Sequence, residues 1–400
     1  VFDAMPAHHQ RIMKIAMDNG WFVLFPFGQS GAVWWDDVGM NNILNQIRTV
    51  KQEFNIDDNR VWMGGFSDGA SASFMFAMVK PNDFGAFVPL NGHMGVAALD
   101  GKLMTCPGNM ANTPIHAICT DNDGLYPAAV MRETIKMALE AGADMMYREY
   151  NGFGHDFGYA GEELPIIDKF LNCHPRDRFP HKVYCESVGP DFGWMRWLRI
   201  ESIDPKGRAQ WHKNHNSPLV DKRITFGFFI DDKFEGSGLK VDKLVDGSSL
   251  SSEAGLQSED VIVECQGQKI EGNDDLNKVK QTLNRGDEVT MKVIRQGEVV
   301  ELNGKLPPPV HYLLMPQTQP TGALKAKYTA NSFTIENSQV SKFSIFIHPE
   351  MVQLDQPVRV IVDGEELFNE IVKPDLEFMI ENYRNHYDDE LIYVNKIEVE

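Results

Sequence analysis

The sequence predicts an α/β domain over residues 1–177 and a largely β-structured region after it. Up to residue 150, short apolar runs that end in turns alternate with helical stretches, as in a mostly parallel sheet covered by helices. From residue 223 the chain becomes richer in β-branched residues and in turns with glycine and aspartate. From residue 323, short alternating runs follow one another, as in antiparallel sheets.

Composition limits the classes of partner. The 400 residues are 42% hydrophobic and 24% charged, with a net charge of −19, which argues against nucleic acid and anionic membranes. No apolar run approaches the roughly 18 residues that span a bilayer. The five cysteines are too few and too scattered for a disulfide framework. The pairs His8-His9, Cys173-His174 and His212-x-x-His215 have no second ligand pair at zinc spacing. We therefore expect no transmembrane segment, no metal and no cofactor.

The first elements are a helix over about residues 9–18 and a buried strand over residues 20–26. Trp34, Trp35 and Asp36 follow on a loop, where they either line a substrate pocket or serve the structure. The sequence alone leaves both roles open.

Residues 65–69, Gly-Phe-Ser-Asp-Gly, lie between the strand-like residues 60–64 and the helix-like residues 70–80. This pattern is typical of a nucleophile elbow, which presents a serine on a strained turn between a strand and a helix. We expect both glycines to be required because a Cβ at either would collide with the neighbouring helix and strand. Ser67 is then the candidate nucleophile, although serine is also a good helix N-cap.

The elements that follow bring an acid and a histidine in order along the chain. They are a strand within residues 84–92, a strand over 116–120, a helix over about 128–141 and a strand over 144–150. Asp121 and Asp123 come directly after the second strand, and His155 lies on the glycine-rich loop after the last. Because the carboxyl ends of parallel strands share one edge, we expect these side chains to meet Ser67.

Residues 10–175 resemble the later part of an α/β-hydrolase of the carboxylesterase, phospholipase and prolyl-oligopeptidase-like group. The resemblance implies Ser67 as nucleophile, His155 as base and the Asp68 N–H as one oxyanion donor. The family spacing between the acid and a proline fits Asp123 and leaves Asp121 as the alternative acid.

The same resemblance implies that the chain is N-terminally truncated. The family takes its second oxyanion donor from a loop upstream of the first helix here, and the first strands of its sheet also lie upstream. We expect both to precede Val1, together with any targeting signal. By analogy with exported hydrolases of this architecture, the expected location is periplasmic or secreted.

Residues 223–306 resemble a PDZ domain of the type attached to bacterial proteases. The resemblance rests on Ala-Gly-Leu at 254–256, Asp-Val-Ile at 260–262 and Gly267, although Glu259 stands where the family usually has glycine. It implies that the loop Phe226, Gly227, Phe228 and Phe229 takes the terminal carboxylate of a peptide added as an extra strand. A spacer without ligand is the alternative.

The remaining segments, residues 178–222 and 307–400, predict one small β-sandwich interrupted by the PDZ domain. Residues 194–203 read as one strand, and four short runs between 323 and 362 read as antiparallel strands, with Asp363 and Gly364 as a hairpin turn. A helix over 375–386 and a strand over 391–399 close the domain.

Two functions are compatible with these predictions. The first is a serine hydrolase that cleaves an ester or peptide bond, with a PDZ module that tethers a partner or substrate terminus. The second is a binding or scaffold protein whose hydrolase domain is inactive. The feature that separates them is the oxyanion loop expected upstream of Val1, because a full-length protein that supplies it would favour the enzyme.

Overall fold

A computed structural model describes residues 7–28, 31–245 and 249–400. The chain divides into two compact units, one built from residues 1–217 and 313–400 and the other from residues 218–312. The first unit contains an α/β layer structure and a β-rich part, and the second is a small β-structured unit whose described residues include two helices.

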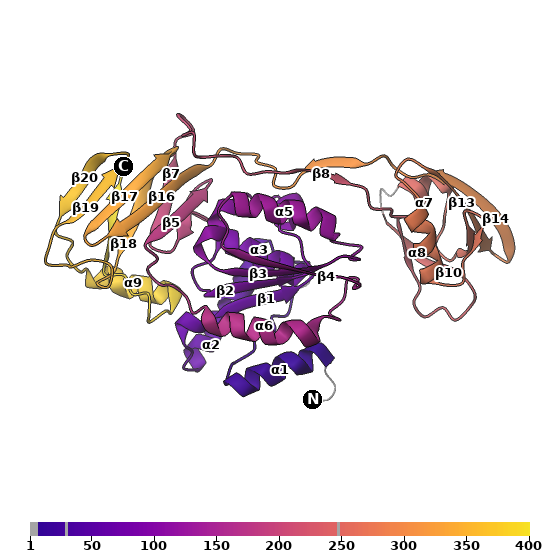
Figure 1. The fold of residues 1–400 in the computed structure, drawn as a ribbon, viewed down its shortest axis with the longest axis horizontal. Coiled ribbons are helices and arrows are strands. Elements are labelled where there is room, and N and C mark those ends of the chain that lie inside the picture. Colours follow the sequence, from indigo (N-terminus) through magenta and orange to yellow (C-terminus); the bar gives the residue numbers. More distant parts are fainter. Residues whose placement is uncertain (1–6, 29–30, 246–248) are drawn as a thin grey trace. The chain divides into compact units, whose positions relative to one another are not determined.

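A four-stranded parallel sheet forms the centre of the α/β part. Its strands β1 (Trp62–Phe66), β2 (Ala86–Leu90), β3 (Ile115–Thr120) and β4 (Met145–Tyr150) lie side by side in chain order. Figure 1 shows helices on both faces of this sheet, with α3 and α5 on one side and α1 and α6 on the other. All four strands therefore direct their carboxyl ends toward one edge.

Most helices of the α/β part bury one face and expose the other. The described helices of this part are α1 (Ala7–Asn19), α2 (Asp37–Glu53), α3 (Asp68–Val79), α4 (Val96–Leu99), α5 (Ala128–Glu140) and α6 (Ala160–Cys173). Ile12 and Ile15 of α1 and Leu164 of α6 pack with Val88 and Ile118 of the sheet. In contrast, α3 is buried along almost its whole length, because it lies between the sheet and other segments.

The strand predicted over residues 20–26 does not form among the described residues. The Trp21 N–H donates back to the Ala16 carbonyl at 2.8 Å, and the Trp21 ring packs on Trp62 with centroids 5.0 Å apart. Phe22 and Phe25 are 61% and 43% exposed. A strand requires a neighbour that completes its hydrogen bonds, and no described strand pairs with this segment.

The β-rich part of the first unit consists of two sheets on a common core. One has the order β20-β19-β17-β16-β5 and the other β21-β18-β7-β6. Trp197, Phe333 and Ile345 belong to the core that the two sheets share. The strands are β5 (Lys182–Ser187), β6 (Trp194–Met195), β7 (Leu198–Ile203), β16 (Gly322–Thr329), β17 (Ser332–Ser338), β18 (Val340–Ile347), β19 (Val358–Val362), β20 (Glu365–Glu370) and β21 (Asn395–Val399).

Two details of these sheets differ from the sequence prediction. The single strand predicted over residues 194–203 is a tight hairpin, because Arg196 adopts a φ of 55° and turns β6 back onto β7. Strands β17 and β19 pair in parallel, since β18 between them belongs to the other sheet. The predicted turn at Asp363 and Gly364 does join β19 to β20, with φ values of 51° and 92°.

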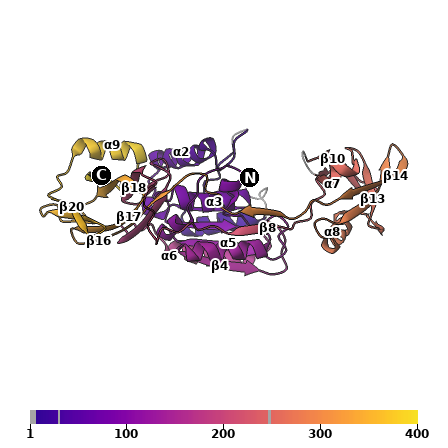
Figure 2. The ribbon, with the colours of Figure 1, turned by 90° about the horizontal axis from the view of Figure 1, so that it is seen from above.

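Helix α9 (Leu376–His386) lies beside α2 of the α/β part (Figure 2). Its N-cap, Asp375, accepts hydrogen bonds from the N–H groups of Glu377 and Phe378. Arg48 of α2 donates to the Asn385 carbonyl near the end of α9 at 2.7 Å. The contact joins the α/β part to the β-rich part within the first unit.

The second unit has a sheet of order β14-β13-β11-β10-β9, with β12 paired to β11. Val241, Ile262 and Val289 are among the core residues, and α8 contributes Leu276 and Val279. The elements are β9 (Phe228–Ile230), β10 (Leu239–Leu244), α7 (Ser249–Ala254), β11 (Val261–Cys265), β12 (Gln268–Lys269), α8 (Asn273–Thr282), β13 (Glu288–Arg295) and β14 (Glu298–Lys305). Strands β8 (Pro218–Asp221) and β15 (Val310–Leu313) pair where the chain enters and leaves the unit.

Candidate active site

Ser67 lies on the turn between β1 and α3 with a φ of 58° and a ψ of −117°. This backbone conformation is costly for a residue with a side chain, and such strain is concentrated at functional sites. The Ser67 N–H donates to the Leu90 carbonyl at 3.0 Å, which continues the pairing of β1 with β2 into the turn. The Ser67 side chain makes no N-cap hydrogen bond to α3, so its hydroxyl is not used for capping.

The two glycines of the turn differ in their surroundings. A Cβ on Gly65 would lie 2.3 Å from the carbonyl carbon of Gly69, so no larger residue fits there without movement of the backbone. A Cβ on Gly69 would meet nothing within 4 Å. The expected collision is therefore correct for Gly65 and wrong for Gly69, because the close approach is between the two backbones and involves the Cβ position of Gly65 alone.

Ser67, His155 and Asp123 form a hydrogen-bonded series. His155 Nε2 is 2.8 Å from Ser67 Oγ, and His155 Nδ1 is 2.8 Å from Asp123 Oδ2. The His155 side chain is 21% exposed, whereas Asp123 is completely buried. The imidazole can therefore be reached from solvent, while the carboxylate behind it is shielded.

Asp123 is surrounded by hydrogen-bond donors. Its Oδ1 accepts from the N–H groups of Leu125 and Tyr126, both at 2.8 Å, and its Oδ2 accepts from the Asn91 amide at 3.0 Å. Burial alone would raise the pKa of Asp123, but these donors and His155 outweigh it and hold the pKa below its ordinary value. The ionised Asp123 carboxylate can therefore stabilise a positive charge on the His155 imidazole.

Asp121, the alternative acid, occupies a different position. Its Oδ1 accepts from the Gly152 N–H at 2.7 Å, so the carboxylate fixes the start of the loop that carries His155. Asp68 is the first residue of α3. N–H groups in the first turn of a helix have no carbonyl partner within the helix, so the Asp68 N–H is available as a donor beside Ser67.

Asn91 was missed in the sequence, where it reads only as the polar end of a strand. It is fully buried, and its amide donates to Asp123 and, at 2.7 Å, to Thr120 Oγ1. The Tyr159 hydroxyl in turn donates to Asn91 Oδ1 at 2.6 Å. No local pattern could reveal this role, because Asn91 and Tyr159 are 68 positions apart along the chain.

Trp35 and Asp36, which were candidates for a substrate pocket, serve the structure. The Trp35 indole donates to Asp100 at 2.9 Å and its side chain is buried. Asp36 is the N-cap of α2, where it accepts from the Gly39 N–H at 2.7 Å.

The proposed peptide loop of the second unit begins in the core and ends at its surface. Phe226 is 3% exposed and belongs to the core, whereas Phe229 is 53% exposed. Gly227 has a φ of 76°, and its carbonyl accepts from the Val245 N–H and the Ser251 hydroxyl. Strand β9 directly follows, and it is the last strand of its sheet, paired on one side with β10.

Two known protein families match parts of this chain. Residues 6–175 match the phospholipase/carboxylesterase family, and residues 219–306 match the PDZ domain family. No helix among the described residues has the length and apolar character needed to cross a bilayer.

Two relatives match short stretches. The serine protease Do-like HtrB of Bacillus subtilis is 37% identical over 90 residues, which is 22% of this chain and 19% of that protein. The bifunctional acetylxylan esterase/xylanase XynS20E of Neocallimastix patriciarum is 32% identical over 81 residues, 20% of this chain and 12% of that protein. The chain thus spans less than a fifth of either relative.

Solved structures with partial similarity include esterases. Arabidopsis thaliana SOBER1 aligns with a TM-score of 0.27 and 17% identity, over 38% of this chain and 71% of that one. The Bacillus cereus carboxylesterase aligns with a TM-score of 0.29 and 16% identity, over 34% of this chain and 60% of that one.

Proposed function

The chain contains a phospholipase/carboxylesterase α/β-hydrolase domain followed by a PDZ domain, and from this we propose that it is a serine hydrolase that cleaves an acyl ester. The observation that carries the proposal is the series of two 2.8 Å contacts from Ser67 through His155 to Asp123. The family match favours an ester over a peptide bond, and the similarity to a protein named as an acetylxylan esterase agrees with that choice.

In the proposed reaction, Ser67 Oγ attacks the acyl carbon while His155 Nε2 accepts its proton. Asp123 holds the imidazole with Nδ1 protonated and stabilises the imidazolium that forms. The Asp68 N–H, assisted by the positive end of α3, stabilises the developing oxyanion. His155 then protonates the leaving alkoxide. In the second half of the reaction, water attacks the acyl carbon while His155 accepts its proton, and His155 returns that proton to Ser67 Oγ as the acid product leaves.

A fluorophosphonate probe tests the nucleophile. We expect labelling of the protein at Ser67, and we expect Ser67→Ala to remove it and to lower ester hydrolysis by at least about 1,000-fold. Ser73→Ala is the matched control, because Ser73 lies on the same helix and its hydroxyl only donates to the Gly69 carbonyl. Labelling that persists in Ser67→Ala, or is absent from a folded wild-type protein, contradicts the assignment.

For the second unit, we propose that the loop at Phe226, Gly227, Phe228 and Phe229 binds the carboxyl terminus of a peptide. Support comes from the PDZ match and from the position of β9 at the end of its sheet, where an extended peptide can add as the next strand. The backbone N–H groups of the loop would bind the carboxylate, as Gly227 permits a close approach.

Binding of paired peptides to the whole protein tests this role. A peptide that ends in a free apolar residue should bind at least about tenfold more tightly than its C-terminal amide, because the amide lacks the terminal charge. Gly227→Ala should weaken binding, whereas Gly286→Ala, which also changes a glycine with positive φ in this unit, should leave it unchanged. Equal affinity for the acid and the amide would contradict carboxylate binding by this loop and favour the alternative that the second unit is a spacer. Peptide binding without labelling of Ser67 would favour the scaffold alternative.

A further inference from the structure

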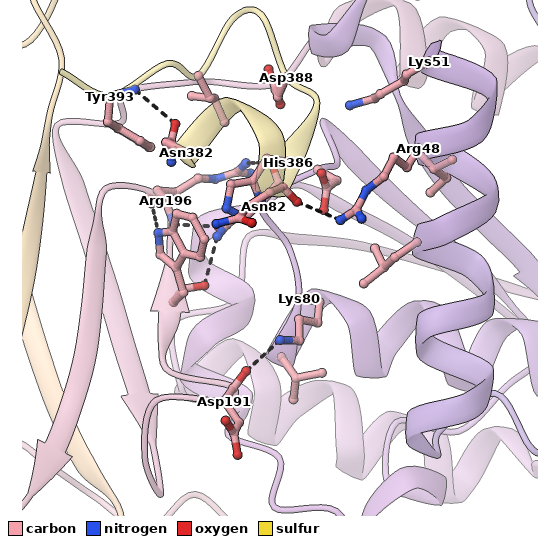
Figure 3. A pocket seen from close by; sticks show the side chains of 17 residues that line it. Arg48, Lys51, Lys80, Asn82, Asp191, Arg196, Asn382, His386, Asp388 and Tyr393 are labelled. Atoms are coloured by element: carbon pink, nitrogen blue, oxygen red, sulfur yellow. Dashed lines mark hydrogen bonds between the residues drawn. The ribbon is translucent and has the colours of Figure 1, made fainter. Parts of the chain in front are cut away.

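A cavity of about 190 Å³ lies where α2, the end of α3 and α9 meet the β6–β7 hairpin (Figure 3). Ser67, Asp123 and His155 are not among its lining residues. Leu44, Ile47, Arg48 and Lys51 line it from one face of α2, and Lys80 does so from the residue after α3. Every lining residue belongs to the first unit. The cavity is therefore formed between the α/β part and the β-rich part of one compact unit.

Three cations line this cavity without a carboxylate partner among the described residues. Arg48 donates to the Asn385 carbonyl at 2.7 Å, and Lys80 donates to the Asp191 carbonyl, also at 2.7 Å. Arg196 is 2% exposed and donates to backbone carbonyls and to Thr113 Oγ1, while its Nε has no partner in the described part of the chain. In Figure 3 these side chains come from three different segments around the cavity.

The remaining charges of the lining do not neutralise these cations. Lys51 is paired with Asp58 at 2.6 Å, and Asp388 is paired with Arg176 at 2.5 Å. Two acids remain, the half-buried Asp83 and the exposed Asp191. Three cations against two acids leave the lining positive, in a chain whose net charge is −19.

Burial of two of these cations, Lys80 and Arg196, is costly without a paired carboxylate. Burial lowers the pKa of Lys80, and it lowers the pKa of Arg196 to about 10, with the nearby charge of Arg176 acting in the same direction. The Phe192 ring and the charges of Asp191 and Asp83 act on Lys80 in its favour, but burial outweighs them, so its charge is incompletely compensated. An anion in the cavity would supply the missing charge.

Apolar side chains form the rest of the lining, including Leu44, Ile47, Trp194 and Leu391. We propose that the cavity binds a small organic monoanion, with its carboxylate held by Arg48 and Lys80 and its apolar body against Trp194 and Leu44. Arg196 supplies positive potential from behind. The volume suits a ring-sized acid, and the site is independent of the proposed chemistry at Ser67.

Fluorine NMR titration of the whole protein tests the proposal with 4-fluorobenzoate and its uncharged isostere, 4-fluorobenzamide. We expect saturable binding of the benzoate and at least tenfold weaker binding of the amide, because only the benzoate carries the charge. Inorganic phosphate, an anion without an apolar body, should compete more weakly than unlabelled benzoate. Equal binding of acid and amide overturns the proposal, and tighter binding of phosphate overturns its assignment of an apolar body.

Substitutions of lining residues test whether the ligand binds in this cavity. Arg48→Gln and Lys80→Gln should each weaken benzoate binding about tenfold, while Asp83→Asn should strengthen it several-fold by removing an opposing charge. Arg132→Gln is the control, because Arg132 is an exposed cation on α5 that is paired with Glu149. Melting temperatures verify that each variant is folded. Unchanged affinity in both cation variants, or weaker binding in Asp83→Asn, overturns the proposal.

Discussion

Asp123 is a buried carboxylate whose ionised state depends on the donors around it. Among the described residues, the side chains that donate to it are the Asn91 amide and His155. Asn91 itself has a φ of 51°, a conformation that asparagine and aspartate tolerate better than most residues. Its side chain is fixed by Tyr159 from the opposite side. We therefore regard Asn91 as a positioning residue for the proposed acid.

Replacement of Asn91 by aspartate tests this role with little change in shape. The new carboxyl group cannot donate when ionised and repels Asp123, so the pKa of Asp123 should rise. In the wild type the Asp123 pKa is lowered, so Asp123 stays ionised until the pH falls below the ordinary pKa of an aspartate. In Asn91→Asp, Asp123 should become protonated at a higher pH than in the wild type. We expect the acid limb of kcat/KM for an acyl ester to shift upward and the neutral-pH value to fall about tenfold or more.

Asn45→Asp makes the same change of charge at an exposed position on α2 and is the control. Its pH profile should match that of the wild type. A profile in Asn91→Asp that keeps its position on the pH axis would show that Asn91 does not act through Asp123.

At the scale of elements, α8 of the second unit carries a half-buried lysine, Lys280, next to its buried apolar face. Leu276 and Val279 are buried, and the next residue, Lys280, is half-buried with its ammonium 5.5 Å from the ring centroid of Phe226. Burial lowers the pKa of Lys280, and no carboxylate pairs with it in the described part of the chain. This places a positive charge without a paired carboxylate beside the proposed peptide loop.

Lys280→Met should have opposite effects on stability and binding. Removal of a partly desolvated cation should raise the melting temperature of the second unit slightly, because the charged form is disfavoured there below its lowered pKa. The same change should weaken binding of a peptide carboxylate about tenfold and leave the amide unaffected. Lys278→Met on the same helix, an exposed residue that pairs with Asp275, should change neither affinity. Equal losses for acid and amide would refute a role in carboxylate binding.

Sequence patterns predicted elements well where local signals decide them. The turn at Asp363 and Gly364 and the elbow at Ser67 follow from residue types that permit positive φ or a close backbone approach. Residues 20–26 were wrongly predicted as a strand because a strand needs a neighbour, which an apolar run alone does not specify. The contacts of Asn91 were also invisible, since they depend on segments that only the fold brings together.

At the scale of the molecule, a buried ion pair joins the α/β part of the first unit to its C-terminal region. Arg176 and Asp388 are 212 positions apart, and Arg176 Nη1 lies 2.5 Å from Asp388 Oδ2. Their side chains are 0% and 2% exposed. Burial alone would raise the pKa of Asp388, but the hydrogen bond and charge of Arg176 outweigh it and hold the pKa below its ordinary value.

Loss of one partner should reverse the pH dependence of stability. In the wild type the Asp388 pKa is lower when folded, so its contribution is complete above the unfolded pKa of about 3.9 and is lost as the pH falls through the folded pKa. In Arg176→Met the unpaired buried carboxylate should have a raised pKa. The free energy of unfolding of this variant should therefore decrease as the pH rises above about 4, because the carboxyl group must then ionise without a partner. The total loss should be roughly 3–5 kcal/mol at neutral pH.

Tryptophan fluorescence measures this effect in the first unit alone, because all seven tryptophans lie within residues 1–217. Denaturant unfolding between about pH 3 and 7 should give a slope for Arg176→Met of opposite sign to that of the wild type in the range where Asp388 titrates. Arg176→Met combined with Asp388→Leu should recover most of the lost stability, since an apolar pair can replace a buried ion pair. If the double variant is as unstable as the single one, packing rather than the unpaired charge explains the loss, and the ion pair does not set the pH response of the junction.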